Sequence, residues 1–259
     1  MAAVSIVVPT YKEAENIPIL TGRIFDAFRG SEFSAELIFV DDNSRDGTVE
    51  AVEKLAQSLP VRLITRTNER GLSSAVIRGF EEAKNDILLC MDADLSHPPE
   101  SIAALIAPIS SGKADFAIGS RYTAGGTTQE DWGFLRRLNS NVATALARPL
   151  TPVRDPMAGF FCLSRETWER ARAAGLSPLG YKIGLEILIK ARCRNVVEIP
   201  ISFSDRLHGK SKLTLKQQLE YLRHLLRLYQ FRFPLITSGL LLIALAGIVY
   251  FAFRTFLRR

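Results

Sequence analysis

Two aspartates, Asp92 and Asp94, stand two residues apart in the segment CMDADLSHPPE, shortly after the apolar run at 87–89. In an extended chain, residues i and i+2 point to the same face, so the two carboxylates are expected side by side. Neighbouring carboxylates raise each other's pKa unless a cation lies between them. Mg²⁺ binds one or two carboxylates and completes its shell with water and phosphate oxygens. The pair therefore predicts a metal-bound diphosphate.

A structural role fits the same stretch. A helix is expected to begin near Pro99, and Asp94 or Ser96 has a suitable side chain to cap it. A DxD pattern alone does not decide between a metal site and a helix cap. The second acidic pair, Asp41 and Asp42, also follows an apolar run, and this favours a shared acidic crevice.

Short β-rich runs alternate with helical patterns in the N-terminal half of the chain. Continuous apolar runs predict strands buried on both faces, and the alternation predicts an α/β fold with a mainly parallel, doubly wound sheet. Ligands bind beyond the carboxyl ends of the strands in such sheets, where Asp41, Asp42, Asp92 and Asp94 are expected. The expected strands are residues 4–9, 35–42, 61–65, 86–94 and 115–120, and the expected helices are residues 13–29, 48–58, 72–83 and 99–109.

Several other protein classes are disfavoured. No GxxxxGK[ST] loop occurs and no GxGxxG follows the first expected strand, which argues against P-loop enzymes and dinucleotide oxidoreductases. The three cysteines form no CxxC pair, so neither a zinc site nor a disulfide framework is indicated. The net charge of +6 suits a nucleic acid, an anionic membrane or a phosphorylated substrate. The aromatic–basic interleaving of a nucleic-acid binder is missing, so no nucleic-acid partner is expected.

The C-terminal part of the chain is expected to contact a lipid bilayer. Residues 214–232 combine an apolar stripe at helical spacing with basic residues on the opposite side, as in a membrane-interface helix. Residues 233–253 carry no charge and would span roughly 31 Å as a transmembrane helix. The alternatives are a surface helix packed on the domain and a buried core helix. The stripe consists of Leu215, Leu219, Leu222, Leu226 and Tyr229, and the basic residues are Lys216, Arg223 and Arg227.

Six segments follow one another along the chain in the same order as the motifs of a known family. They are VVPTYKEAENI, VDDNSRDGT, MDADLSHPPE, IGSRY, DPMAGFF and RLHGKSKL. Together they resemble the dolichol-phosphate mannosyltransferases, or polyprenol monophosphomannose synthases, of glycosyltransferase family 2. The resemblance implies a GT-A catalytic domain over residues 1–213. It implies inverting transfer of mannose from GDP-mannose to a polyprenyl (dolichyl) phosphate, with Mg²⁺ or Mn²⁺ as cofactor. A membrane protein is expected, with its catalytic domain on the cytosolic face of a bacterial or archaeal plasma membrane or of the endoplasmic reticulum.

The resemblance also implies roles for individual residues. Asp92, Asp94 and Arg206 are the expected catalytic residues. The metal would be held by Asp92 and Asp94, with Ser96, where the family has glutamine, as a third position reached directly or through water. The residues resembling the nucleotide-sugar site are Pro9, Tyr11, Glu13, Asp41, Asp42, Asp92, Asp94, Asp155 and Lys212. The residues resembling the acceptor-phosphate site are Arg121, Arg136, Ser140 and Arg206.

Such an acceptor needs no general base. A phosphate monoester has a second pKa near ~6 and is largely a dianion at neutral pH, so it is already a nucleophile. Arginines position and neutralise it through bidentate hydrogen bonds, and the metal stabilises the leaving diphosphate. The expected chemistry therefore agrees with the later motifs, which carry basic residues and no convincing catalytic triad.

Two other functions stay open on the sequence alone. A polyprenyl-phosphate glucosyltransferase using UDP-glucose would share the metal pair and the acceptor arginines, although such enzymes generally carry more transmembrane sequence. A membrane-tethered, non-catalytic binding protein is disfavoured because both acidic pairs are intact. Glu186 is expected either as a buried, paired acid near the site or as a surface residue, and His97 and His208 are expected to be structural.

Overall fold

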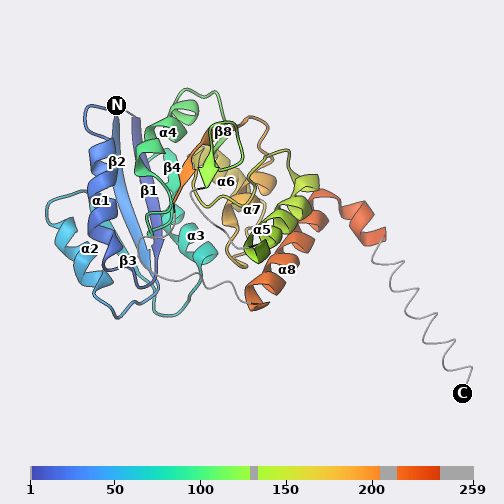
Figure 1. Cartoon of the computed structure of the whole chain (residues 1–259), viewed down its shortest axis with the longest axis horizontal. Helices are drawn as coiled ribbons and strands as arrows, with labels where there is room; N and C mark the ends of the chain where they lie inside the picture. Colours follow the sequence, from blue (N-terminus) through green and yellow to red (C-terminus); the bar gives the residue numbers. More distant parts are fainter. Residues whose placement is uncertain (1, 129–133, 205–214, 240–259) are drawn as a thin grey trace, which may run out of the picture.

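A computed structural model describes residues 2–128, 134–204 and 215–239 of the chain (Figure 1). Its main sheet has the strand order β3-β2-β1-β4-β7-β5-β8. Neighbouring strands are parallel except for β7, which runs antiparallel to both β4 and β5. The strands are β1 (Ala2–Thr10), β2 (Phe33–Asp41), β3 (Val61–Thr65), β4 (Ile87–Cys90), β5 (Phe116–Ser120), β7 (Phe161–Ser164) and β8 (Val196–Pro200).

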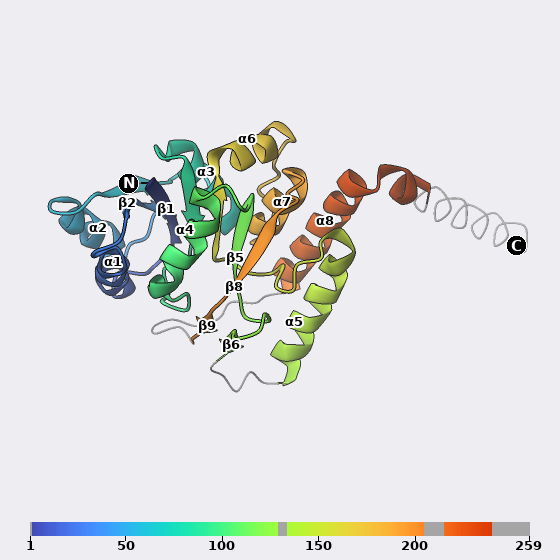
Figure 2. The ribbon, with the colours of Figure 1, turned by 90° about the horizontal axis from the view of Figure 1, so that it is seen from above.

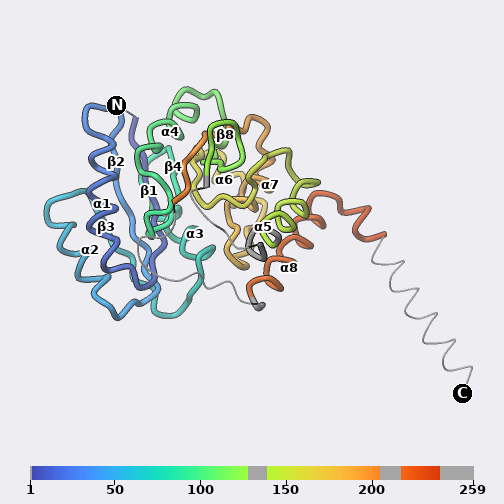
Figure 3. Tube along the Cα trace, in the orientation of Figure 1, coloured from blue at the N-terminus to red at the C-terminus, as the bar shows by residue number. Residues whose placement is uncertain are grey.

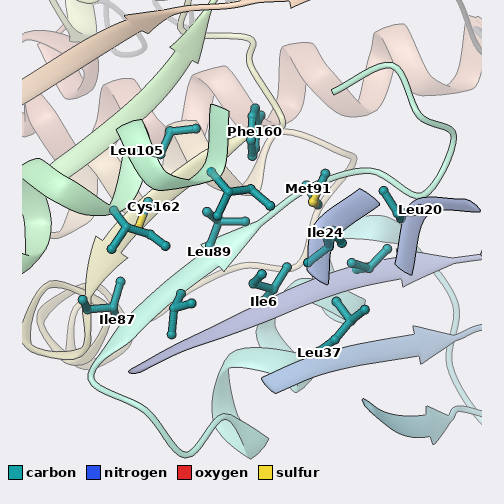
Figure 4. Close-up of a cluster of buried hydrophobic side chains, with 14 of the residues drawn as sticks. Ile6, Leu20, Ile24, Leu37, Ile87, Leu89, Met91, Leu105, Phe160 and Cys162 are labelled. Carbon is teal, nitrogen blue, oxygen red and sulfur yellow. The ribbon is translucent and has the colours of Figure 1, made fainter. Parts of the chain in front are cut away.

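Helices cover both faces of the sheet. Because successive side chains of a strand point to opposite faces, Ile6 of β1 packs in one apolar cluster and Val7 in the other. The Ile6 cluster receives side chains from α1 (Asn16–Ala27), α2 (Thr48–Ala56) and α4 (Ile102–Ser110). Figure 4 shows part of this cluster, with Leu20 of α1 and Leu105 of α4. The Val7 cluster receives side chains from α3 (Leu72–Glu82), α6 (Arg165–Ala173) and α7 (Ile183–Lys190). The three-layer α/β architecture expected from the sequence is therefore confirmed.

The antiparallel strand β7 was not expected from the sequence. It has only four residues and lies between β4 and β5 in the sheet. Because it runs against its neighbours, its first residue, Phe161, lies at the edge where the parallel strands end. The preceding segment, residues 155–160, is thereby delivered to the edge at which Asp92 and Asp94 follow β4.

A second group of elements packs beside the sheet domain. Figures 2 and 3 show α5 (Phe134–Ala147) and α8 (Leu215–Arg232) lying side by side. Ala147, Leu185 and Leu225 belong to one apolar cluster that joins α5, α7 and α8. The remaining elements are η1 (Pro99–Ser101), η2 (Arg148–Leu150) and a small parallel pair, β6 (Thr127–Thr128) with β9 (Ser202–Phe203).

The α8 helix docks through a face other than the expected leucine stripe. Tyr221 and Leu228 are buried against the rest of the protein, whereas Leu219, Leu222 and Leu226 are 50%, 49% and 48% exposed. The helix therefore has two apolar sides, one on the protein and one at the surface. The first side agrees with one of the two alternatives stated above, a surface helix packed on the domain. The membrane-interface role of the second side stays a prediction.

The expected transmembrane helix falls mainly on residues that the structure does not describe. Residues 234–239 are helical, and the rest of the expected span, 240–253, lies outside the described part of the chain. Among the described helices, none combines the length and the apolar character that crossing a bilayer requires.

Glu186 connects α7 to α8. Its carboxylate is 1% exposed, and its Oε2 lies 3.2 Å from Nε2 of His224, which is equally buried. Its Oε1 lies 2.7 Å from Nζ of Lys190 and accepts a 2.8 Å hydrogen bond from the Ser177 N–H. Burial raises the pKa of this carboxyl, but the hydrogen bonds from His224, Lys190 and Ser177 outweigh burial and hold the pKa below its usual range. Of the two sequence alternatives, the buried, paired acid is confirmed.

We predict that Glu186→Ala lowers the free energy of unfolding by about 3 kcal/mol, because Lys190 and His224 lose a buried partner. Glu186→Gln should cost less at neutral pH. Since the pKa of Glu186 is lowered in the folded protein, its stabilisation is complete above the ordinary glutamate pKa. It should fade as the pH falls through the lowered value. Urea unfolding at several pH values measures both effects.

Glu166→Gln on α6 is the matched control, because its carboxylate is 81% exposed and also pairs with a residue four positions away. It should change stability little at any pH. A difference between the wild-type protein and Glu186→Gln that stays constant down to strongly acidic pH contradicts the prediction.

Candidate active site

The loops that follow β1 and β2 are joined by hydrogen bonds. The Lys12 N–H donates to Ser44 Oγ at 2.8 Å, and the Glu13 N–H donates to Thr48 Oγ1 at 3.0 Å. Lys12 itself has a φ of 63°, a left-handed turn that costs energy for a residue with a side chain. The two loops thus form one rigid wall at the carboxyl edge of the sheet, next to Pro9 and Thr10 at the end of β1.

Asp41 does not face the crevice, and this expectation from the sequence is wrong. The residue is fully buried at the end of β2. Its Oδ1 accepts a 2.6 Å hydrogen bond from Ser44 Oγ, and its Oδ2 accepts a 2.8 Å bond from the Ser44 N–H. The chain turns at Asn43, with a φ of 57°, and the Asp41 carboxylate stabilises that turn.

Asp42 is bonded to the loop that follows β3. Nε of Arg66 donates to Asp42 Oδ1 at 2.8 Å, Nη2 of Arg66 also binds that oxygen, and the Gly71 N–H donates to Asp42 Oδ2 at 2.8 Å. The Arg66 side chain is only 3% exposed. Arg66 was missed in the sequence, although it directly follows an expected strand and therefore lies at the ligand-binding edge. Asp42 is thus paired with a cation at the wall of the crevice.

Tyr11 presents an aromatic surface between two cations. Its side chain is 38% exposed. Nζ of Lys12 lies 5.5 Å from the centre of its ring, and Cζ of Arg70 lies 5.4 Å from it. A planar base stacks well on such a ring, and cations beside it suit an attached phosphate. Glu13, in the same loop, accepts a 2.6 Å hydrogen bond from Asn16 Nδ2.

Asp92 and Asp94 lie on the segment after β4 and differ in environment. The Asp92 side chain is 33% exposed, whereas Asp94 is buried at 6%. Ser96 donates its hydroxyl to Asp94 Oδ1 at 2.6 Å, so it orients Asp94 in this structure. A Cβ atom at Gly159 would stand 3.5 Å from both Asp92 carboxylate oxygens, so the glycine keeps space open beside them.

These residues fit a divalent ion with few protein ligands. Among the described residues, no group of three or more His, Cys, Asp and Glu side chains is arranged to hold a metal. Asp92 and Asp94 could hold such an ion if water or substrate oxygens filled its other positions. Mg²⁺ usually binds in this way.

His97 holds Asp92 from inside the protein. Its Nδ1 accepts a 3.0 Å hydrogen bond from the Asp92 N–H, and its Nε2 lies 3.8 Å from Asp92 Oδ2. Its ring stacks on Phe160 with 5.1 Å between the centres. Burial holds the pKa of His97 below its usual value, so the ring is neutral and carries its proton on Nε2. In this structure His97 supports Asp92, and its expected structural role stays a prediction.

Arg121 and Asp155 form a buried bidentate pair. Nε and Nη2 of Arg121 each donate to one Asp155 oxygen at 2.8 Å, and the Arg121 N–H donates to Oδ2 at 3.1 Å. Asp155 is fully buried. Burial lowers the pKa of Arg121, but the pair with Asp155 outweighs burial and raises it above the usual value. The family resemblance assigns these residues to different subsites, and the structure joins them in one unit.

Lys182 enters the same region from the residue before α7 and was missed in the sequence. Its Nζ donates to the Met157 carbonyl at 2.6 Å. Burial and the nearby Arg121 charge lower its pKa to about 8, against the opposite influence of Asp155 and Asp92. No sequence motif marks Lys182, because its contact with the loop 155–160 joins residues distant along the chain and forms only in the folded protein.

The remaining expected site residues are described only in part. Ser140 Oγ lies 3.1 Å from the hydroxyl of Tyr122, the neighbour of Arg121, so α5 contacts the Arg121 segment. Arg136 precedes Ser140 by one turn of α5 and shares its helix face, and its side chain is outside the described part. Arg206 and Lys212 lie outside the described residues. The last described residue before them, Ser204, donates its N–H to the Ser96 carbonyl at 3.3 Å, beside the acidic pair.

Solved structures with low sequence identity share this fold. Glucosyl-3-phosphoglycerate synthase from Mycobacterium tuberculosis, in complex with Mn²⁺, uridine-diphosphate and glucosyl-3-phosphoglycerate, matches with a TM-score of 0.61 and 19% identity. The match covers 89% of this chain and 80% of that one. Mannosyl-3-phosphoglycerate synthase from Rubrobacter xylanophilus matches with a TM-score of 0.63 and 16% identity, over 89% and 76% of the two chains. The chain therefore has a GT-A-like α/β fold.

Sequence relatives are much more similar. The family model described as "Glycosyl transferase family 2" matches residues 5–170. A dolichol-phosphate mannosyltransferase of Pyrococcus furiosus is 48% identical over 87% of this chain, which spans 63% of that longer protein. One from Saccharomyces cerevisiae is 46% identical over 88% of each chain. A polyprenol monophosphomannose synthase of Mycolicibacterium smegmatis is 35% identical over 81% of this chain and 80% of that protein. The chain belongs to glycosyl transferase family 2 and, within it, to the family of dolichol-phosphate mannosyltransferases.

Proposed function

We propose that this protein transfers mannose from GDP-mannose to a polyprenyl phosphate, with inversion at the sugar carbon. The observation that carries the proposal is the meeting of opposite charges at one edge of the sheet. The acidic pair, Asp92 and Asp94, follows β4, and the Asp92 charge acts on both Arg121 and Lys182. Such a site suits a reaction in which an anionic phosphate attacks close to an anionic diphosphate. The names of the relatives support mannose as the sugar and dolichyl phosphate as the acceptor.

The donor nucleotide would bind along the wall formed by the loops after β1, β2 and β3. Tyr11 offers its exposed ring to the base, between Lys12 and Arg70. Pro9 and Glu13 lie in the same loop region, and Asp42 is held at the wall by Arg66. Asp41 supports the turn beneath them and makes no contact with the nucleotide in this proposal.

Asp92 and Asp94 would hold a divalent ion, Mg²⁺ or Mn²⁺. When bound, the ion would supply Lewis-acid stabilisation of the leaving diphosphate. His97 orients Asp92 through its backbone N–H, and Ser96 orients Asp94 through a hydrogen bond to Oδ1. These two supporting residues pre-organise the carboxylates before the donor arrives.

The acceptor phosphate would bind on the opposite side, at Arg121 with Arg136, Ser140 and Arg206. Asp155 fixes the plane of the Arg121 guanidinium by two parallel hydrogen bonds. A phosphate dianion needs no base, so these residues position it and neutralise its charge. Lys182 adds a further positive charge between the two anions.

The lipid acceptor requires a position at the membrane surface. The exposed leucines of α8 and the apolar segment 233–253 would hold the domain there, with residues 1–213 on the cytosolic side. The half-exposed side of α8, with Leu219, Leu222 and Leu226, would face the lipid headgroups.

Incubation of the detergent-solubilised full chain with polyprenyl phosphate and a panel of sugar nucleotides tests the proposed function. We expect lipid-linked mannose from GDP-mannose, with the β configuration, and much slower transfer from UDP-glucose. Lipid-linked glucose from UDP-glucose, without product from GDP-mannose, overturns the choice of sugar. If no donor yields a lipid-linked product, the proposed enzyme activity is wrong.

The metal site has its own prediction. Asp92→Asn and Asp94→Asn should each weaken Mn²⁺ binding by more than about tenfold, and Ser96→Ala by about tenfold through the loss of orientation. Mn²⁺ titration followed by electron paramagnetic resonance, with GDP present, measures this directly. Asp86→Asn is the control because its side chain is 97% exposed. Full turnover in EDTA, or unchanged Mn²⁺ binding in both aspartate variants, is incompatible with the proposed site.

The lowered pKa of Lys182 predicts that the activity depends on pH. Its pKa is lowered to about 8, so it is charged below that pH and neutral above it. Since kcat/KM reports ionisations of the free enzyme, we expect kcat/KM to fall as the pH rises through about 8. Lys182→Arg keeps the charge at all accessible pH values and should remove the fall, whereas Lys182→Met should lower kcat/KM throughout. A wild-type profile that persists in Lys182→Arg assigns the ionisation to another group.

A further inference from the structure

A cleft lies beside α5, next to the segments that carry Arg121 and Asp155. It encloses about 880 Å³ and is bounded by α5 on one side and by the segment 151–154 on the other. Tyr122 lines its near end, and the hydroxyl of this tyrosine lies next to Ser140. A volume of this order is typical of small-molecule sites and much larger than a single phosphate ion needs.

The walls of the cleft carry hydrogen-bond donors. Asn141, Thr144 and Arg148 follow one another at spacings of three and four residues, so they lie on one face of α5 and its 3₁₀ extension. Thr151 and Arg154 face them from the opposite wall.

Thr144 is the residue that points to a ligand. It is only 9% exposed and lines the cleft, yet its hydroxyl has no hydrogen-bond partner among the described residues. A buried hydroxyl without a partner costs free energy. The hydroxyl oxygen is closed off from solvent in this structure, so a ligand oxygen in the cleft would satisfy it after a rotation of the Thr144 side chain.

The charge of the cleft is positive. Arg148 and Arg154 line it without an ion pair to any described carboxylate, and Glu198 accepts hydrogen bonds from the backbone N–H groups of Arg154 and Asp155. No acidic side chain belongs to the described lining. Two guanidinium groups with hydroxyl and amide donors match the oxygens of a phosphate group.

We propose that this cleft binds the phosphate headgroup of an anionic phospholipid, at a site additional to the acceptor phosphate. The same helix exposes Val142 and Leu146, which are 49% and 40% exposed, so polar and apolar surfaces occur on adjoining sides of the same turns of α5. A ligand with a phosphate headgroup and acyl chains fits both surfaces. The inference does not depend on which sugar the protein transfers.

Titration calorimetry of the full chain in a neutral detergent tests the proposal, with short-chain phosphatidylglycerol as the probe. Short-chain phosphatidylcholine and inorganic phosphate are titrated separately. We expect saturable binding of phosphatidylglycerol and weaker binding of phosphatidylcholine, because its choline offsets the phosphate charge. Arg148→Gln and Arg154→Gln should each weaken phosphatidylglycerol binding by about tenfold. Thr144→Val keeps the shape of the side chain and should weaken binding several-fold.

Arg78→Gln and Arg172→Gln are matched charge controls on α3 and α6, with arginine side chains 48% and 56% exposed. They should leave binding unchanged, and thermal unfolding checks that all variants fold. Inorganic phosphate that binds with the same sensitivity to the cleft variants shows that the phosphate group alone is recognised. If phosphatidylglycerol binds and inorganic phosphate does not, the whole headgroup is needed for binding. Equal losses in the control variants, no saturable binding, or cleft variants that impair only the use of polyprenyl phosphate would each overturn the proposal.

Discussion

The site is organised around the buried pair of Arg121 and Asp155. Removing both charges from water is expensive, and two parallel hydrogen bonds with a third from the Arg121 N–H offset that cost. Asp155 begins the segment that leads into the antiparallel strand β7. The pair therefore fixes the start of this segment at the carboxyl edge of the sheet. Three features of the site depend on that placement.

The first feature is the carbonyl of Met157, which accepts the hydrogen bond from Lys182. The second is Gly159, whose missing side chain leaves space beside the Asp92 carboxylate. The third is Phe160, on which His97 stacks while its Nδ1 holds the Asp92 backbone. One short segment thus positions a cation, the open space beside the Asp92 carboxylate and the histidine that supports Asp92. The antiparallel direction of β7 is what brings its preceding loop to this edge.

Charge at the site is arranged by burial as much as by sequence. Asp155 keeps Arg121 charged inside the protein, whereas Lys182 has no carboxylate in direct contact among the described residues and its pKa falls to about 8. Farther out, Glu186 draws together His224 of α8 and Lys190 of α7. Because Lys182 directly precedes α7, the helix that docks α8 also begins at the candidate active site. The fold therefore connects the expected membrane-facing helix to the site through one short element.

Local sequence determined the alternation of strands and helices, because runs of apolar residues and helical periodicity depend on nearby residues alone. Local sequence also determined that Asp92 and Asp94 lie at the carboxyl edge of the sheet, where ligands bind, because parallel strands all end at that edge. Arg66 was within reach of the same argument and was overlooked. Asp41 was expected to face the crevice, whereas a turn at Asn43 directs its carboxylate inward. Only the tertiary structure decided the pairing of Arg121 with Asp155, the entry of Lys182 and the burial of Glu186. These contacts join residues distant along the chain, and their energies depend on burial that no local pattern encodes.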